Sequence, residues 1–182
     1  MIDSEALFAP MDEGEIHLEE LAERHREGLR AACAADTQIW EIYPFNMSGA
    51  GFDPVFDAIM ANLNRRPFAL MVDGVVIGMS GYLNLALDRQ ALEIGGTFIA
   101  PATRGTGLNG RIKKLLLDRA FGCGIRRIEF RVDERNARSQ AAVLKLGATR
   151  EGLLRAERIT WNGHVRNTAV FSLLAEEWAQ RV

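Results

Sequence analysis

Residues 93–110 read EIGGTFIAPATRGTGLNG, and this stretch carries the strongest local signals in the chain. Its first half has the apolar and β-branched residues of a strand, and it leads into a glycine-rich run at 104–110. From Leu108 onward, apolar residues recur at helical spacing until Gly122 and Gly124 end the pattern. We therefore predict a strand, a glycine-rich loop and a helix in this order.

The glycine-rich run has the properties of a pyrophosphate-binding loop. Gly105 and Gly107 let the backbone approach a ligand without a Cβ in the way, and the following helix points its free N–H groups at the same place. Arg104, Arg111 and Lys113 are expected to add positive charge. The simpler alternative is a helix start whose glycines only satisfy a turn.

Two other phosphate-binding motifs fit less well. Gly105, Gly107 and Gly110 spell GxGxxG, and Asp133 stands near the end of the next strand, where a ribose-binding acid would stand in a dinucleotide fold. However, the residues APATR separate the strand from the first glycine, and the preceding strands form a hairpin and not a βαβ unit. No GxxxxGK[ST] sequence is present, which excludes a P-loop.

The rest of the chain alternates helices and strands. Asp73-Gly74 and Asn162-Gly163 are hairpin turn signals, because these pairs suit positive φ angles. The other expected elements are a short strand at 16–21, helices at 20–34 and 54–64, a third meander strand at 91–100, a half-buried strand at 127–132, and a helix from Asn136 to Leu146 that Gly147 stops. We predict one domain over 1–182 with a mixed α/β sheet.

Composition narrows the function classes. The chain has 182 residues and a net charge of −2, so no general basic surface for nucleic acid or anionic membranes is expected. No apolar run reaches about 18 residues and the first residues are acidic, which predicts a cytoplasmic, soluble protein. Cys33 and Cys123 stand far apart and the three histidines are scattered. We therefore expect neither a disulfide nor a metal site, and we expect both cysteines in the core.

The motifs from Glu93 to Gly147, in their order, resemble the GNAT superfamily of acetyl-CoA-dependent N-acetyltransferases, especially its RimJ/RimL-like branch. Arg104 and Gly107 match the [QR]xxGx[GA] motif that opens a helix in the superfamily. Asn136 and Ser139, with KLG at 145–147, match a second motif in the N-x-x-S form of the branch. The resemblance covers residues 15–178 and implies an acyl-CoA N-acyltransferase fold, with a mostly antiparallel sheet flanked by helices.

Three positions depart from the family pattern. Asn109 stands where Gly or Ala is usual, and Ala148 stands where Phe usually follows the glycine. Many relatives carry a Tyr seven residues after the Asn, but this chain has Val143 there. The last turn of the loop must therefore accept the Asn109 side chain, the change at Ala148 is expected to affect packing and not chemistry, and the general acid cannot be the usual Tyr.

The resemblance also implies which residues hold acetyl-CoA as co-substrate. The backbone of the strand at 97–100 would pair with the pantetheine arm, and amides near Phe98 to Ala100 would polarise the thioester carbonyl. The loop at 104–109 would hold the pyrophosphate through its N–H groups. Asn136 would bond the pantetheine arm, cap its helix, or do both. The cofactor-binding candidates are Phe98, Ile99, Ala100, Arg104, Gly105, Thr106, Gly107, Leu108, Asn109, Asn136 and Ser139.

Two residues are candidates for catalysis. An acceptor amine titrates at about 8 for an α-amino group or about 10 for a lysine-like amine, so a base is needed. Glu93 lies eleven residues before Arg104, the spacing of the strand glutamate in histone-acetylating relatives, and burial would tune its pKa toward neutrality. The alternative is a structural Glu bonded to a neighbouring strand. Ser139 would donate to the departing sulfur or would only satisfy the helix start.

Three hypotheses for function remain open at this point. The first is an N-acetyltransferase that works by direct attack in a ternary complex on the N-terminal amine of a protein or peptide. The second is acetylation of a small amine such as a polyamine, an amino acid or an antibiotic. The third is a non-catalytic acyl-CoA-binding module. Asp36 and Glu41 in the aromatic segment 36–46, with Phe52 and Phe56, could flank a cationic amine, although core packing is the favoured reading of these aromatics. A homodimer through an exposed sheet edge is a family-level expectation.

Overall fold

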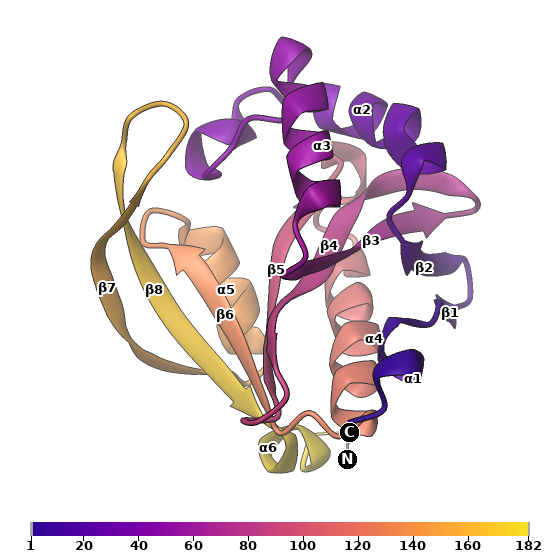
Figure 1. Cartoon of the computed structure of the whole chain (residues 1–182), viewed down its shortest axis with the longest axis vertical. Helices are drawn as coiled ribbons and strands as arrows, with labels where there is room; N and C mark the ends of the chain where they lie inside the picture. The colour runs from indigo at the N-terminus through magenta and orange to yellow at the C-terminus, as the bar shows by residue number, and fades with distance from the viewer. Residues whose placement is uncertain (1, 182) are drawn as a thin grey trace.

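The computed structural model of this chain describes residues 2–181. Its eight strands form one sheet in the order β1-β2-β3-β4-β5-β6-β8-β7, and all neighbours are antiparallel except β5 and β6. The strands are β1 Met11–Glu13, β2 Ile16–Glu20, β3 Arg65–Val72, β4 Val75–Ala86, β5 Ala91–Ile99, β6 Arg127–Asp133, β7 Thr149–Ile159 and β8 Val165–Leu174. The helices are α1 Ser4–Phe8, α2 Arg26–Ala34, α3 Phe52–Ala61, α4 Leu108–Gly122, α5 Ala137–Lys145 and α6 Ala175–Ala179. The predicted mixed α/β fold is confirmed (Figure 1).

Both predicted hairpins are present. Val72 pairs with Val75 across a two-residue turn, in which Asp73 and Gly74 have φ angles of 50° and 77°. The second hairpin closes more loosely, because Ile159 is paired with Val165 and the Asn162-Gly163 pair lies inside a five-residue connection. Local turn chemistry therefore fixed where these strand pairs reverse.

The ends of the chain and two helix starts differ from the prediction. Helix α1, strand β1 and helix α6 were not predicted. Helix α1 is capped by the Asp3 carboxylate, which accepts from the Ala6 N–H, and Glu177 caps the start of α6. The helix predicted at 20–34 begins as a 3-10 turn at Glu23–His25, and α3 starts two residues before Pro54. No helix within residues 2–181 is long and apolar enough to cross a bilayer.

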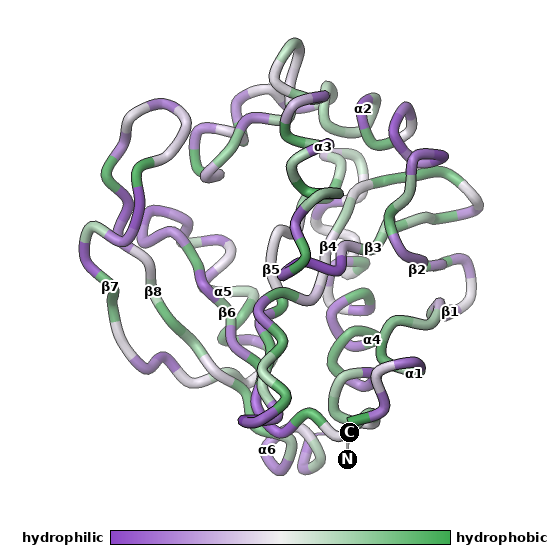
Figure 2. Tube along the Cα trace, in the orientation of Figure 1, coloured by the Kyte–Doolittle hydropathy of each residue, from purple (hydrophilic) through white to green (hydrophobic). Residues whose placement is uncertain are grey.

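Two hydrophobic clusters cover opposite faces of the sheet. Helix α4 packs in the larger cluster through Ile112, Leu116 and Ala120, together with α1 and α6. Helices α2 and α3 pack over the other face of β3, β4 and β5 and form a second cluster around Trp40 and Phe98. Strand β7 lies at the sheet edge, is exposed along almost its whole length and carries both hydrophobic and hydrophilic stretches (Figure 2).

Strands β5 and β6 separate soon after they pair. Their parallel ladder covers only Ala91–Glu93 against Arg127–Glu129, and beyond it the two strands diverge (Figure 1). The register between β4 and β5 shifts on both sides of the pairs that hold Glu93, and Gly96 has a φ of 61°. Such irregularities bend a strand away from its neighbour. The sheet is therefore split into two arms with a gap between them.

Candidate active site

The gap between β5 and β6 holds a cavity of about 600 Å³. It is lined by β5, β6, the starts of α4 and α5, and the segment 39–45 that lies over the gap. Of the candidate residues from the sequence, it brings together Glu93, Ile99, Arg104, Gly105, Asn109, Asn136 and Ser139. Phe98, Ala100, Thr106, Gly107 and Leu108 are adjacent in the chain but are not part of the lining.

The loop before α4 offers a cradle that suits a pyrophosphate. Gly105 and Gly107 have φ angles of 80° and 85°, and a Cβ built at either position would have no atom within 4 Å beyond those of its own and the adjacent residues. Within residues 2–181, the N–H groups of Gly105, Thr106, Gly107 and Asn109 make no hydrogen bond with protein. The Thr106 hydroxyl donates to Thr103 O, and Leu108 is buried at the start of α4. Free N–H groups at a helix start favour an anion.

The expectation that Arg111 adds positive charge to this loop is wrong, and the charge that Arg104 brings is already paired. The Arg104 guanidinium is paired with the Asp36 carboxylate at 2.5 Å and donates through Nε to Ile99 O. Arg111 points away from the loop to the connection between β1 and β2, where it pairs with Glu13 and Glu15. The cradle therefore depends on backbone groups, and Arg104 serves to hold the loop against the segment that begins at Asp36.

Lys113 lies beneath β5 and has no acidic partner within residues 2–181. Its Nζ donates to Ser80 Oγ at 3.1 Å and to Thr97 Oγ1 at 2.5 Å, and the residue is 7% exposed. Burial lowers the pKa of Lys113 to about 7. It therefore carries only part of the charge that the sequence suggested, although it does line the cavity.

The edge of β5 that faces the gap presents few free amides. A Cβ at Gly78 on β4 would collide with the Phe98 carbonyl, so the Phe98 backbone points toward β4. Because these groups alternate along a strand, the amides of Thr97 and Ile99 face the gap. The N–H of Ala100 donates to Ile77 O, so the expectation that Ala100 offers an amide to a ligand is wrong. The Phe98 side chain is buried and stacks on Trp40 with ring centroids 4.8 Å apart.

The start of α5 forms the opposite wall. Asn136 accepts from the Ser139 N–H through its Oδ1 at 2.9 Å, so it caps the helix as predicted. The Ser139 hydroxyl makes no hydrogen bond within residues 2–181 and lines the cavity. Val143 is buried one turn further and also lines the cavity, whereas Ala148 belongs to the core. Ser139 is thus a free hydroxyl at a helix start that faces the gap.

Glu93 lies where the two arms separate. It is 8% exposed, accepts from Asn84 Nδ2 at 3.1 Å, and has Arg131 Nε 3.7 Å from its Oε2. Burial raises the pKa of Glu93, while Arg131 and the Asn84 hydrogen bond oppose that shift. A Cβ at Gly95 would lie 2.8 Å from Glu93 Oε1, so the carboxylate rests on the bare backbone of that glycine. Both readings from the sequence, base and structural partner, fit this position.

The residues proposed to flank a cationic amine are divided: Tyr43 and Phe45 of the segment 36–46 line the cavity, whereas the two acids and the two further phenylalanines do not. Asp36 is held by Arg104, which keeps the pKa of its carboxyl below the usual range, and Glu41 is exposed outside the cavity lining. Phe52 and Phe56 are fully buried, which confirms the core reading of these aromatics.

The cysteines lie in the core as predicted, and two further polar residues have structural roles. Cys33 and Cys123 are free and buried. His25 is buried, accepts from the Ala22 N–H and contacts Glu19. Asp133 is paired with Arg135 and Arg166 and is not free to bind a ribose.

Sequence reasoning missed two further residues of the cavity wall as individuals. Tyr43 donates its hydroxyl to Thr97 O, and burial raises its pKa to about 12. Arg65 at the start of β3 lies against Gly96, whose missing Cβ leaves room for the guanidinium. Tyr43 lies in the aromatic segment 36–46 that the sequence singled out as a whole, whereas Arg65 has no local signal, because it reaches the cavity from a segment distant in sequence. The burial of Lys113, in contrast, had a signal in the sequence, because this residue falls on the apolar face of α4 with Leu116 and Leu117.

Comparison with known proteins identifies the family. Residues 15–149 match the model of the acetyltransferase (GNAT) domain. A probable GNAT-family acetyltransferase from Chromobacterium violaceum superposes with a TM-score of 0.87 at 31% identity, over 94% of both chains. Mycobacterium smegmatis RimJ in complex with CoA-disulfide superposes with a TM-score of 0.77 at 22% sequence identity, over 93% of this chain and 87% of that chain. Vibrio cholerae spermidine N-acetyltransferase in complex with CoA and spermine superposes with a TM-score of 0.74 at 16% sequence identity, over 92% of this chain and 99% of that chain.

A search of curated protein sequences finds no match. The split sheet, the glycine loop at the start of α4 and the family match define an N-acetyltransferase. The chain belongs to the GNAT acetyltransferase family.

Proposed function

We propose that this protein uses acetyl-CoA to acetylate a primary amine by direct attack in a ternary complex. The observation that carries the proposal is a buried carboxylate, Glu93, in a cavity that also borders the open glycine cradle before α4. Acetyl-CoA, when bound, supplies the acetyl thioester. Its pyrophosphate would be held by the free N–H groups of the loop, those of Gly105, Thr106, Gly107 and Asn109. Its pantetheine arm would be held by the gap-facing backbone of Thr97 and Ile99.

The residues of this chain then prepare the amine and the leaving group. Glu93 takes a proton from the acceptor ammonium, directly or through water, and its raised pKa suits that work. The free Ser139 hydroxyl, at the helix start of α5, donates toward the developing thiolate. Tyr43 holds the segment 39–45 to Thr97 of β5 and limits access of water to the gap.

Direct attack is supported by the position of the cysteines. Neither Cys33 nor Cys123 belongs to the cavity lining, and burial raises the pKa of Cys33 to about 12. A thiol in that state is a poor nucleophile, because the thiolate is the reactive form. A covalent acetyl-cysteine on this chain is therefore not part of the proposal.

For the acceptor, we propose the N-terminal amine of a protein or peptide, with a small amine as the alternative. The N-x-x-S motif formed by Asn136 and Ser139 supports the RimJ/RimL-like branch. The structural neighbours include a protein named RimJ and a spermidine N-acetyltransferase, which stand on either side of this choice.

Two smaller proposals concern the location of the protein in the cell and its oligomeric state. We propose a cytoplasmic location, which fits two buried cysteines that are not bridged. We propose a homodimer through the edge strand β7, because Leu153, Leu154 and Ile159 are exposed along it. Light scattering after gel filtration checks the dimer. A monomer at micromolar concentration would contradict it.

Mass spectrometry of acceptors incubated with acetyl-CoA tests the main proposal. The panel contains peptides with free N-termini, polyamines, amino acids and aminoglycosides. We expect acetylated peptides blocked only at the α-amine, and we expect Glu93→Gln to lower kcat by about 10²- to 10⁴-fold, the usual contribution of a general base. Acetyl-CoA binding without product from any acceptor would instead support the non-catalytic module.

A further inference from the structure

One face of the split sheet carries basic residues that the proposed reaction does not use. Tyr82 donates its hydroxyl to Leu116 O of α4, so its neighbour Leu83 faces away from α4. Glu93 and Arg65 pair with Leu83 on its two sides and therefore share that face. The cradle lies at the start of α4, so these groups approach the gap from the side opposite that helix.

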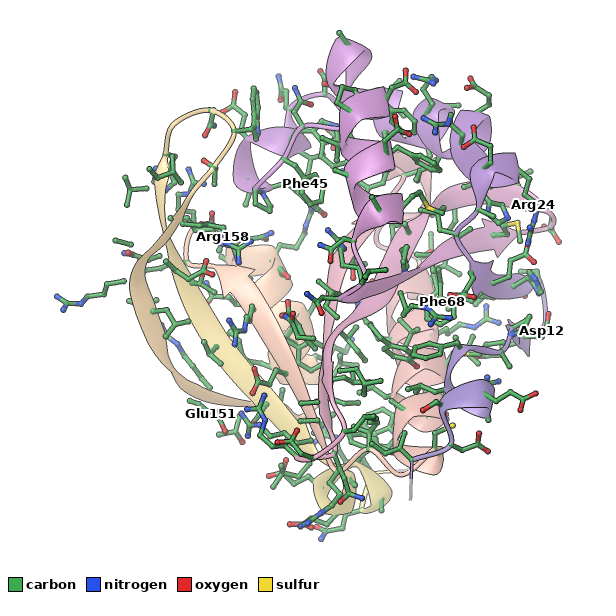
Figure 3. All side chains as sticks on the ribbon, viewed as in Figure 1. Asp12, Arg24, Phe45, Phe68, Glu151 and Arg158 are labelled. Carbon is green, nitrogen blue, oxygen red and sulfur yellow. The ribbon has the colours of Figure 1, made fainter. Side chains whose placement is uncertain are left out.

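The second arm adds three more arginines to the same space. Phe130 on β6 packs into the cluster around α4, so Arg131 faces the other way, toward Glu93. Arg158 and Arg166 are paired across β7 and β8, and both line the cavity. Figure 3 shows Arg158 on the arm of β7 and Phe45 on the opposite side of the gap.

Most of these arginines already have carboxylate partners. Arg131 contacts Glu129 and Glu93, and Arg158 is paired with Glu157. Arg166 lies 3.9 Å from Asp133. Among the described residues 2–181, the acids that line the cavity itself are Glu93 and Asp133.

Arg65 is the exception. Within residues 2–181, its guanidinium makes no ion pair or hydrogen bond, and its Nε is buried without a partner. The Phe45 ring lies 5.7 Å from the guanidinium carbon, and a Cβ at Gly96 would collide with Nη2. Burial lowers the pKa of Arg65, and Arg158 acts in the same direction while Glu93 opposes it. Arg65 as a whole is half-buried, and a partly desolvated cation without a counter-ion is costly, so a bound anion would lower that cost.

We propose that the acceptor carries a carboxylate close to its reacting amine, and that Arg65, with Arg158 beside it, binds this carboxylate while the amine lies at Glu93. The inference rests on the proposed function and narrows its substrate class. A guanidinium suits a carboxylate because it can donate two parallel hydrogen bonds. A polyamine would instead place further positive charge beside these arginines.

Two sources could supply the carboxylate. It is the α-carboxylate of a free amino acid, or the side chain of an acidic residue at the start of a peptide. Both place an anion a few bonds from a primary amine, so they share the chemistry that Arg65 recognises. The assay below separates them.

Matched acceptors that differ only in the carboxylate provide the kinetic test. L-amino acids are compared with their amides, and peptides that begin with Asp are compared with peptides that begin with Asn. We expect kcat/KM to favour the acid of the relevant pair by about 10- to 100-fold, as for a hydrogen-bonded charge. The pair that shows the preference identifies the source. Equal rates within both pairs, or faster reaction of amides or polyamines, would overturn the inference.

Variants of Arg65 assign the preference to this residue. Arg65→Gln should bring the acid-to-amide ratio of kcat/KM close to 1, and Arg65→Lys should keep part of the preference. Arg126→Gln is the matched control, because Arg126 is exposed before β6 and lies outside the cavity lining. Arg65→Gln should also raise Tm, since it removes a half-buried charge whose Nε has no partner. A preference that survives in Arg65→Gln would contradict the assignment.

A binding readout keeps the inference independent of turnover. Calorimetric titration in the presence of CoA compares N-acetylglycine with N-acetylglycinamide, and the α-amide of N-acetylaspartate with the α-amide of N-acetylasparagine. If no acceptor is acetylated, the proposed function fails, but carboxylate binding that is lost in Arg65→Gln still supports this inference. Equal binding of acid and amide by the wild-type protein in both pairs would overturn it even if some amine is acetylated.

Discussion

Glu93 is the residue on which the chemistry depends most. Its carboxyl is buried at the edge of an open cavity, and burial is the main cause of its raised pKa. A base must be deprotonated to act, so kcat/KM should fall as pH drops through that pKa, above the usual carboxyl value of about 4.3.

Asn84 provides a way to shift the pH at which kcat/KM falls, the acid limb of the pH–rate profile. Its side-chain amide donates to Glu93 and thereby favours the charged form. Asn84→Asp removes the donor and adds a like charge, so the acid limb of kcat/KM should move to higher pH. The φ of 53° at this position remains acceptable for Asp. An unmoved limb in the pH–rate profile would exclude Glu93 as the titrating base.

Gly95 keeps the Glu93 carboxylate in place. A Cβ at this position would lie 2.8 Å from Oε1, and the carboxylate is the flexible partner that must move. Gly95→Ala should therefore lower kcat by about 10-fold or more, since misplacement of a reacting group is costly, while the chain stays folded. Gly152→Ala on β7 is the control, because a Cβ there meets open space. Equal activity of the two variants would argue against a precise role for Glu93.

Lys113 costs the protein stability. Its folded pKa of about 7 lies below its unfolded value, so the folded state resists a proton that the unfolded state accepts. The penalty is absent where both states are neutral, grows as pH falls below about 10.4, and is complete below pH 7.

Lys113→Met tests this penalty. Ser80 and Thr97 can still bond each other, since their hydroxyl oxygens are 2.8 Å apart. The variant should gain at least about 3 °C in Tm at pH 6, and less at pH 10. Thermal melts between pH 6 and 10 measure the difference. A gain that does not change with pH would mean that Lys113 is not neutral in the fold at high pH.

Among the elements, the junction of the loop and α4 determines cofactor binding. Gly107 precedes the helix with a φ of 85°, and its N–H is free. Gly107→Ala introduces a left-handed non-glycine residue, which costs about 1–2 kcal/mol. The local backbone should relax and the KM for acetyl-CoA should rise by about 10-fold, with little change in the KM of the acceptor.

Gly122→Ala separates this effect from a general effect of glycine replacement. Gly122 is the last residue of the same helix, and a Cβ there meets nothing within 4 Å. This variant should keep the wild-type KM for acetyl-CoA. If both variants bind acetyl-CoA as the wild type does, the loop is a turn and not a cradle.

Local signals were enough to predict most of the elements. Asp73-Gly74 reversed the chain where expected, and Asn136 capped α5, because turn and cap chemistry act within a few residues. The separation of β5 from β6 could not be read from the sequence, since it depends on how β4, β5 and β6 pair. The Arg104–Asp36 pair joins residues 68 positions apart and has no local signal either.

The cavity joins groups from both arms and from both faces of the sheet. The cradle lies at the start of α4, whereas Glu93 and Arg65 face away from that helix. This arrangement lets cofactor and acceptor approach from different sides and meet in the gap. Both substrates can therefore be bound at once, which is the basis of direct transfer.

Initial rates over a grid of acetyl-CoA and acceptor concentrations, with the mass of the protein recorded in parallel, test this account most directly. Direct transfer predicts reciprocal plots that intersect, and a protein whose mass is unchanged after incubation with acetyl-CoA alone. Parallel plots together with an acetylated protein would contradict it, because they would require a covalent intermediate on the chain.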